Sequence, residues 1–120
     1  MVIEEKSTTT DVTPDPIFAV ATGYMAAKHL FIANEVGLFE QLATGPRTLD
    51  ELATKSGIPR RTMRIVADVM AALGFVECQD GHYQNGPVAT TFLSGATPAD
   101  LRPLLRFWNY ISYPAWLGLE

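Results

Sequence analysis

The sequence predicts a mainly α-helical fold, a winged helix-turn-helix with a small β-hairpin wing and additional helices at both ends. Apolar residues recur at helical spacing over most of the chain, which indicates helices. Two predicted helices are joined by a tight Ser-Gly turn, and one pair of short strand-like segments follows, joined by Asp80-Gly81. Helix, turn, helix and hairpin in this order are typical of a winged helix. With 120 residues and 48% apolar residues, the chain is long enough for one domain with its own core.

The chain divides into a tail and one domain. Residues 1–13 are polar and rich in Ser and Thr, so we expect a disordered tail. The domain, residues 14–120, divides further into N-terminal dimerisation helices (14–44), a winged helix (45–93) and a C-terminal helical arm (94–120).

The first helix is apolar on more than one side. Asp15 as N-cap and Pro16 at the first helical position predict its start, and it runs to about Asn34. A helix that is apolar nearly all round has to be buried on several sides. It is either the central helix of the core or a helix buried by a second copy of the chain, and we favour the second copy because large apolar patches are uncommon on monomers. The candidate dimer-interface residues are Ile17, Phe18, Val20, Ala21 and Phe31.

The next helix is short and has one apolar side. It is expected over residues 35–43, with Leu38, Phe39 and Leu42 on the apolar side. The breakers of Thr44-Gly45-Pro46 end it.

The winged-helix segment has the clearest local signals. Thr48 followed three residues later by Glu51 is a capping box, which starts a helix that ends at Ser56-Gly57. Residues 60–73 form the second helix, and Gly74 stops it. Its expected core positions are Met63, Val66, Met70 and Leu73. Residues 75–78 and 82–85 are the candidate strands of the wing.

The C-terminal segment is a helical arm rich in aromatic residues. Pro103 disfavours helical geometry at Arg102, so a short turn should precede the main helix, and Tyr113-Pro114 should break or bend it. Residues 107–116 contain five aromatic residues. They serve either core and interface packing or a pocket for a flat, apolar ligand, with Asn109 and Tyr110 as hydrogen-bonding groups.

The chain lacks the motifs of a self-contained catalytic centre. No two of its nine glycines are two residues apart, which excludes a G-x-G dinucleotide loop, and there is no P-loop or G-x-S-x-G serine motif. One cysteine and two distant histidines, His29 and His82, do not make a metal site. We therefore expect no catalytic, cofactor-binding or metal-binding residue in this chain.

A winged helix also suggests DNA binding, so a small winged-helix transcription regulator is the alternative function. Arg60, Arg61 and Arg64 begin the second helix of the unit and could meet phosphates. The net charge of −4 and the acidic Asp80 in the wing argue against this alternative. We do not expect nucleic acid as a partner.

The sequence predicts a cytoplasmic protein. Cys78 is the only cysteine, so no internal disulfide is possible, and residues 1–6 do not begin a signal peptide. The longest apolar stretch, residues 17–33, is shorter and more polar than a typical membrane span, so no membrane is expected as a partner.

The order of elements resembles the N-terminal dimerisation domain of class I S-adenosylmethionine-dependent O-methyltransferases, enzymes of secondary metabolism that act on small molecules. The resemblance covers about residues 14–120. The segments that carry it are "ANEVGLFEQLA", "LDELATKSGIPRRTMRIVADVMAALGFV" and "YQNGPVATTFL".

This resemblance implies a homodimer in which the winged helix serves assembly. It implies that a Rossmann-like domain, which binds S-adenosylmethionine and carries the catalytic histidine, is missing from this chain. The acceptor, an aromatic or polyketide-like molecule, would then lie between that domain and helices of this one. Matching positions give the substrate-pocket candidates Tyr24, Met25, His29, Phe107, Trp108, Tyr110, Ile111 and Tyr113. Some members of the family catalyse decarboxylation, hydroxylation or pericyclic reactions, and a stand-alone protein that binds an aromatic metabolite is a third possibility.

Overall fold

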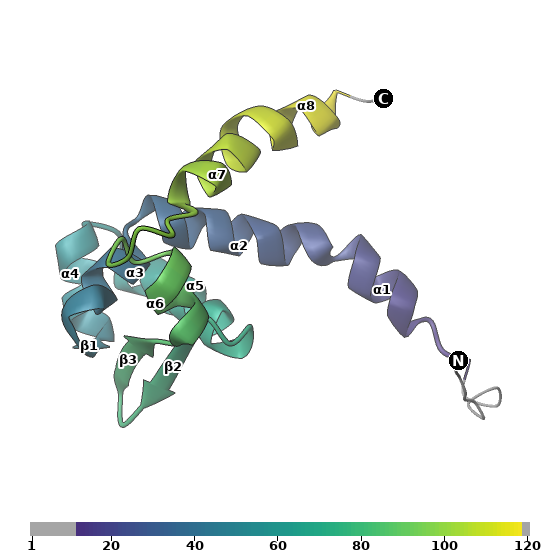
Figure 1. The fold of residues 1–120 in the computed structure, drawn as a ribbon. Helices are drawn as coiled ribbons and strands as arrows, with labels where there is room; N and C mark the ends of the chain where they lie inside the picture. Colours follow the sequence, from purple (N-terminus) through teal and green to yellow (C-terminus); the bar gives the residue numbers. More distant parts are fainter. Residues whose placement is uncertain (1–11, 119–120) are drawn as a thin grey trace.

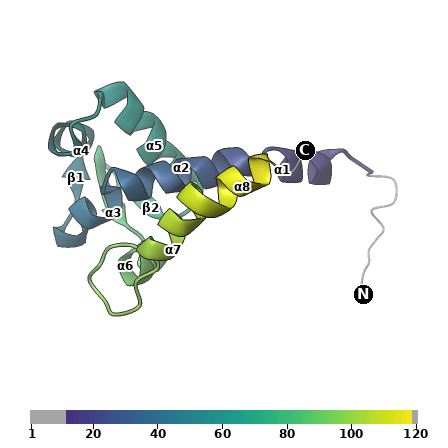
Figure 2. The ribbon, with the colours of Figure 1, turned by 90° about the horizontal axis from the view of Figure 1, so that it is seen from above.

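The computed structural model describes residues 12–118 and confirms the mainly helical winged-helix fold (Figure 1). Most of the predicted tail, residues 1–11, lies outside the described residues. Two helical segments extend from the winged-helix body on the same side and diverge from each other (Figures 1 and 2). The radius of gyration, 17.2 Å, exceeds the ~14 Å expected of a compact chain of this length.

The predicted first helix consists of two helices, α1 (Asp15–Ala21) and α2 (Gly23–Glu35). They meet at Thr22, whose hydroxyl donates to the carbonyl oxygen of Phe18 at 2.6 Å. Such side-chain bonds to the preceding turn compete with the backbone ladder and bend helices. Asp15 is the first helical residue rather than the predicted N-cap, and its carboxylate lies where the helix dipole favours negative charge.

The helix predicted over residues 35–43 is shorter than expected. Gly37 has a φ of 75°, a left-handed conformation that favours glycine and separates α2 from α3 (Leu38–Gln41). A 3-10 turn, η2 (Leu42–Thr44), follows α3.

The helix-turn-helix forms as predicted. Helix α4 (Leu49–Ser56) starts with a complete capping box, in which the Glu51 amide donates to the Thr48 hydroxyl oxygen at 3.2 Å and the Thr48 amide donates to Glu51 at 2.8 Å. Helix α5 (Arg60–Ala72) follows Pro59.

The wing is a three-stranded antiparallel sheet with the order β1-β3-β2. Strands β2 (Val76–Gln79) and β3 (His82–Asn85) are joined by Asp80-Gly81 with φ values of 53° and 75°, as a tight hairpin turn requires. The two-residue strand β1 (Arg47–Thr48) pairs with β3 and was not predicted.

The core lies where α2, α3, α4, α5 and the sheet meet. Its fully buried side chains are Leu38, Phe39, Leu52, Met63, Val66, Met70 and Val76. Leu73 was predicted for this core, but it caps the end of α5 and is exposed.

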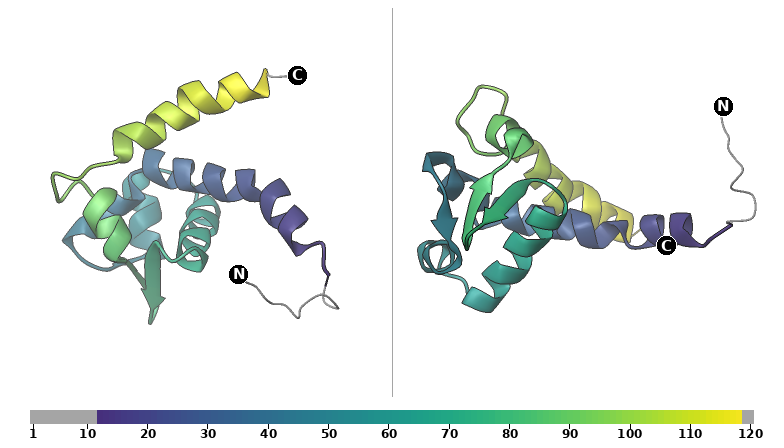
Figure 3. Two further views of the ribbon diagram at one scale, coloured as in Figure 1. Left: turned by 45° about the vertical axis from the view of Figure 1, so that its right-hand side comes forward. Right: turned by 90° about the horizontal axis from the view of Figure 1, so that it is seen from below.

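Helix α6 (Pro87–Phe92) and a loop lead to the C-terminal arm, defined here as residues 102–117. The arm consists of α7 (Arg102–Phe107), the π-helical turn η3 (Trp108–Ser112) and α8 (Tyr113–Leu117). The break predicted at Tyr113-Pro114 is absent and the arm continues as a helix (Figure 3). Pro114 lacks an amide hydrogen and would clash with a carbonyl one regular turn earlier, and the wider π turn just before it gives this ring space.

Candidate assembly and substrate-facing surfaces

The α1 surface, defined as Ile17, Phe18, Val20 and Ala21, is apolar and unburied. Helix α1 contains no buried residue, and Ile17, Phe18 and Val20 are 68%, 59% and 83% exposed. The helix extends away from the body, so its sides are not covered by the described chain (Figure 1). An exposed cluster of large apolar side chains marks a surface for another molecule.

Phe31, the fifth interface candidate, lies elsewhere. It is 8% exposed and belongs to the core of its own chain. The α2 helix is therefore anchored in the body at its C-terminal end, and Phe31 has almost no surface left for a second copy.

The stretch Asp15–Glu35 meets the length and composition of a membrane span, which differs from the expectation that this region is too short and too polar. The stretch has 21 residues. Its most apolar window of 18 residues has a mean hydropathy of 1.2, and 11% of that window is buried. A single helix of this kind does not establish a membrane span, because a buried core helix and an N-terminal signal sequence meet the same criteria.

The substrate-pocket candidates of α2 are all partly exposed. Tyr24 and Met25 are about half exposed. His29 is half-buried and its Nδ1 lies 2.6 Å from the carbonyl oxygen of Met25. A carbonyl oxygen only accepts, so Nδ1 is the donor, and Nε2 is the ring nitrogen left for a ligand.

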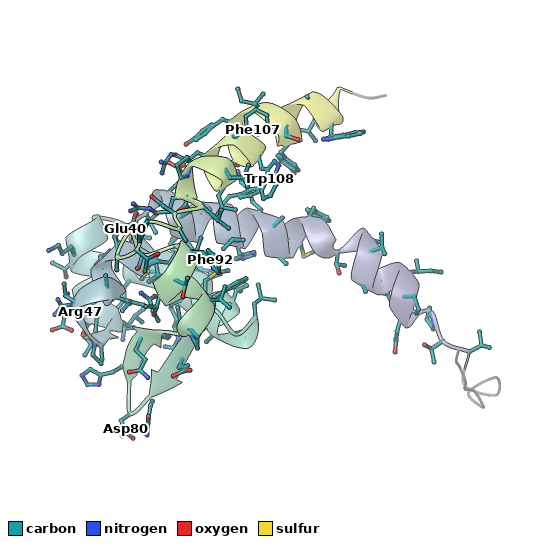
Figure 4. The ribbon with its side chains drawn as sticks, viewed as in Figure 1. Glu40, Arg47, Asp80, Phe92, Phe107 and Trp108 are labelled. Carbon is teal, nitrogen blue, oxygen red and sulfur yellow. The ribbon has the colours of Figure 1, made fainter. Side chains whose placement is uncertain are left out.

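The pocket candidates of the arm lie on different sides of it. Figure 4 shows Trp108 on the side that faces α2 and Phe107 on the opposite side. Phe107, Trp108, Tyr110 and Ile111 are all exposed, whereas Tyr113 is half-buried. The structure therefore does not bring all predicted pocket residues together in one cavity of this chain.

The side of the arm that faces α2 carries polar contacts that sequence reasoning missed. The Lys28 ammonium donates to Asn109 Oδ1 at 3.0 Å and lies 6.0 Å from the centre of the Tyr113 ring. Two turns further along α2, a hydrogen bond with the Glu35 carboxylate raises the pKa of Tyr110. The available signal was a lone lysine within an otherwise apolar helix, because such a cation needs a partner or water.

The base of the arm is held by an ion-pair cluster. The Arg102 guanidinium donates to Asp100 and Glu40, with the closest atoms at 2.8 Å in both pairs. The Asn34 side chain donates to the Arg102 carbonyl oxygen at 3.3 Å. Hydrogen bonds from Arg102 lower the pKa of Asp100 to about 2. The loop before α7 is thereby fixed to α3 and α2.

The arginines of the helix-turn-helix are largely neutralised within the unit. Arg60 pairs with Asp50 at 2.5 Å, and Arg64 lies 3.7 Å from Asp68. Asp80 occupies the tip of the wing (Figure 4). These carboxylates would repel a phosphate backbone, so this surface does not favour nucleic acid.

No group of three or more His, Cys, Asp or Glu side chains is placed to hold a metal ion within residues 12–118. The buried Tyr83 of β3 donates its hydroxyl to the carboxylate of the exposed Asp68 of α5 at 2.5 Å. Burial, and then Asp68, raise the pKa of Tyr83 well above its usual value. This pair joins β3 to α5 and has a structural role.

Comparisons with known proteins agree with the fold. Relatives include 3-hydroxy-5-methyl-1-naphthoate 3-O-methyltransferase of Streptomyces sahachiroi, 34% identical over 87% of this chain and 30% of its own length. N,N-dimethyltransferase OxyT of Streptomyces rimosus is 36% identical over 93% of this chain and 34% of its own. The structure of PigF with SAH matches with a TM-score of 0.84 and 26% identity, over 90% of this chain and 36% of PigF.

The chain spans about a third of the length of the curated relatives that it matches. The family model of the O-methyltransferase dimerisation domain matches residues 18–95, which include α2, the helix-turn-helix, the wing and α6. The chain therefore belongs to the O-methyltransferase dimerisation domain family.

Proposed function

We propose that this chain is the dimerisation and acceptor-substrate-pocket part of an S-adenosylmethionine-dependent O-methyltransferase, and that it assembles as a homodimer through the α1 surface. The observation that carries the proposal is a helix of seven residues with no buried side chain and three large apolar ones exposed. Burial of these side chains is favourable and needs a partner. A second copy presents the same apolar surface, which suits a symmetric interface.

The acceptor is proposed to be an aromatic or polyketide-like small molecule. Exposed aromatic side chains of the arm, among them Trp108 on the side that faces α2, support a flat ligand (Figure 4). One relative is named for a hydroxynaphthoate, a flat aromatic acceptor. Because the predicted residues do not close a cavity within this chain, a further protein surface has to complete the pocket.

S-adenosylmethionine is proposed to bind outside residues 1–120, and the chain is proposed to have no methyltransferase activity alone. The sequence has no glycine-rich loop at a strand-to-helix junction, the feature that usually holds such a nucleoside. The binding of SAH by PigF supports this cofactor for the complete enzyme. We also propose a cytoplasmic location, for which the single cysteine is the support.

Sedimentation velocity and calorimetry test the proposal. At micromolar concentration the chain should sediment at twice its mass of 13.1 kDa. Titration with S-adenosylmethionine should give no heat of binding. A monomer over the whole accessible concentration range would contradict the assembly, and saturable S-adenosylmethionine binding would contradict the division of roles.

A further inference from the structure

A polar contact joins the middle of α2 to the outer half of the arm. Lys28, near the middle of α2, reaches a residue 81 positions later in the sequence, where its ammonium donates to Asn109 Oδ1 at 3.0 Å. The same ammonium lies 6.0 Å from the centre of the Tyr113 ring, within range of a cation–π interaction. Asn109 and Tyr113 are four residues apart, one turn of the arm, so both face Lys28.

The partners of Lys28 are neutral and belong to the arm. No carboxylate lies within ion-pair distance of Lys28 among residues 12–118. Asn109 is buried, with 9% of the residue exposed. Its amide oxygen therefore depends on Lys28 for a hydrogen-bond donor at this site. Lys28 is exposed, so water can solvate its ammonium when the contact opens, and a contact of this kind opens more easily than a buried ion pair.

The arm has little else to hold it beyond this point. Its base is fixed by Arg102, but α8 contains no buried residue and packs mainly on η3, the preceding turn of the arm. Within residues 12–118, Lys28 therefore makes the outermost polar contact that links the arm to α2. The π turn η3 places Asn109 and Tyr113 at this contact. Such turns within helices are frequent at functional sites.

We propose that Lys28 is a positioning residue. Through Asn109 and Tyr113 it holds the aromatic arm against α2, and it thereby fixes the position of the Trp108 side chain relative to the acceptor. This proposal rests on the proposed substrate pocket for its functional meaning. The tether itself concerns two elements of one chain and can be measured without substrate.

The test measures the distance between the wing and the end of the arm. Cys78, exposed in β2, is the single native cysteine, and Leu117→Cys, also exposed, supplies a second label position in α8. Spin labels at both positions give a distance distribution by electron–electron resonance. An excess of unlabelled chain suppresses distances between protomers.

Lys28→Met removes the ammonium and keeps the length of the side chain. The variant loses the net contribution of one hydrogen bond to the equilibrium between tethered and open arm. The ratio of tethered to open arm should therefore fall by about two- to tenfold, which broadens the distance distribution. Lys28→Arg, which keeps a cation that can donate to Asn109 and stack on Tyr113, should retain the narrow distribution. Lys55→Met, on the exposed face of α4, is the matched control and should match the wild type.

The tether would be refuted if the distance distribution of Lys28→Met is unchanged. It would also be refuted if the distribution of Lys28→Arg is as broad as that of Lys28→Met. Asn109→Leu removes the acceptor from the other side and has to reproduce Lys28→Met, which guards against an effect confined to one variant. Sedimentation of the same proteins reports on assembly separately. A monomeric wild type with a narrow distance distribution would overturn the proposed dimer and leave the tether standing.

Discussion

Val20→Asp should dissociate the dimer without unfolding the chain. Val20 lies in α1, is 83% exposed and does not belong to the hydrophobic core or to the residues packed against it. Its replacement therefore removes no core packing within the monomer. In the proposed dimer the same side chain is buried against the second copy, where an aspartate would have to lose its water.

The exposed fraction sets the size of this effect. Full burial of a valine side chain is worth ~1.5–3 kcal/mol, so the 83% available at Val20 corresponds to about 1.2–2.5 kcal/mol in each copy. A symmetric interface contains the residue twice, which gives ~2.5–5 kcal/mol and a dissociation constant raised about 60- to 4,000-fold. Desolvation of the new carboxylate adds to the loss.

Sedimentation equilibrium over a dilution series measures the dissociation constant directly. The matched control is Val88→Asp, the same substitution at an exposed position near the N-terminal end of α6, where a negative charge is tolerated well. Circular dichroism and thermal melting of both variants check that the body is folded. If Val20→Asp and Val88→Asp have the dissociation constant of the wild type, the assignment of the α1 surface is refuted.

Three further predictions concern the body and the base of the arm. Leu52→Ala, at a fully buried position, should lower the free energy of unfolding by ~2–5 kcal/mol in urea denaturation, and a loss below that of exposed Thr54→Ala would contradict the core. Thr48→Ala removes the N-cap of α4 and should cost ~0.5–2 kcal/mol in the same assay, again judged against Thr54→Ala. The third concerns pH. Because the folded pKa of Asp100 is lowered to about 2 from 3.8, its stabilising contribution is present above about pH 4 and lost as the pH falls towards 2. Melting temperatures of Asp100→Asn should show a flatter dependence over that interval, and an unchanged slope would show that the contact with Arg102 does not matter for folding.

The winged helix could be predicted closely because each of its boundaries has a local cause. The Thr48–Glu51 box, the turn at Asp80-Gly81 and the position of Pro59 act on neighbouring backbone atoms, so the sequence displays them. Strand β1 could not be predicted. It has two residues, and its pairing with β3 is a contact between distant parts of the chain.

The ends of the chain were harder to predict, for different physical reasons. Thr22 is not a strong helix breaker, and the bend arises because its hydroxyl bonds to Phe18 in this particular rotamer. Pro114 signals a break, but the π turn accommodates it. Of the predicted interface set, Phe31 went into the core because the helix carrying it passes from solvent into the body along its length. Periodicity shows which residues share a face, but not how far along a helix the cover extends.

The absence of any buried side chain in α1 has a consequence for how this protein responds to dilution. A helix of seven residues is too short to persist by backbone hydrogen bonds alone, since helices below ~12–15 residues are marginal in water. In the proposed dimer the order of α1 is therefore maintained by mass action, and it depends on how much protein is present. Amide hydrogens of residues 17–21 should exchange faster as the solution is diluted, while those of α4 and α5 keep their rate. The first helix then reports, within each molecule, whether a second one is bound.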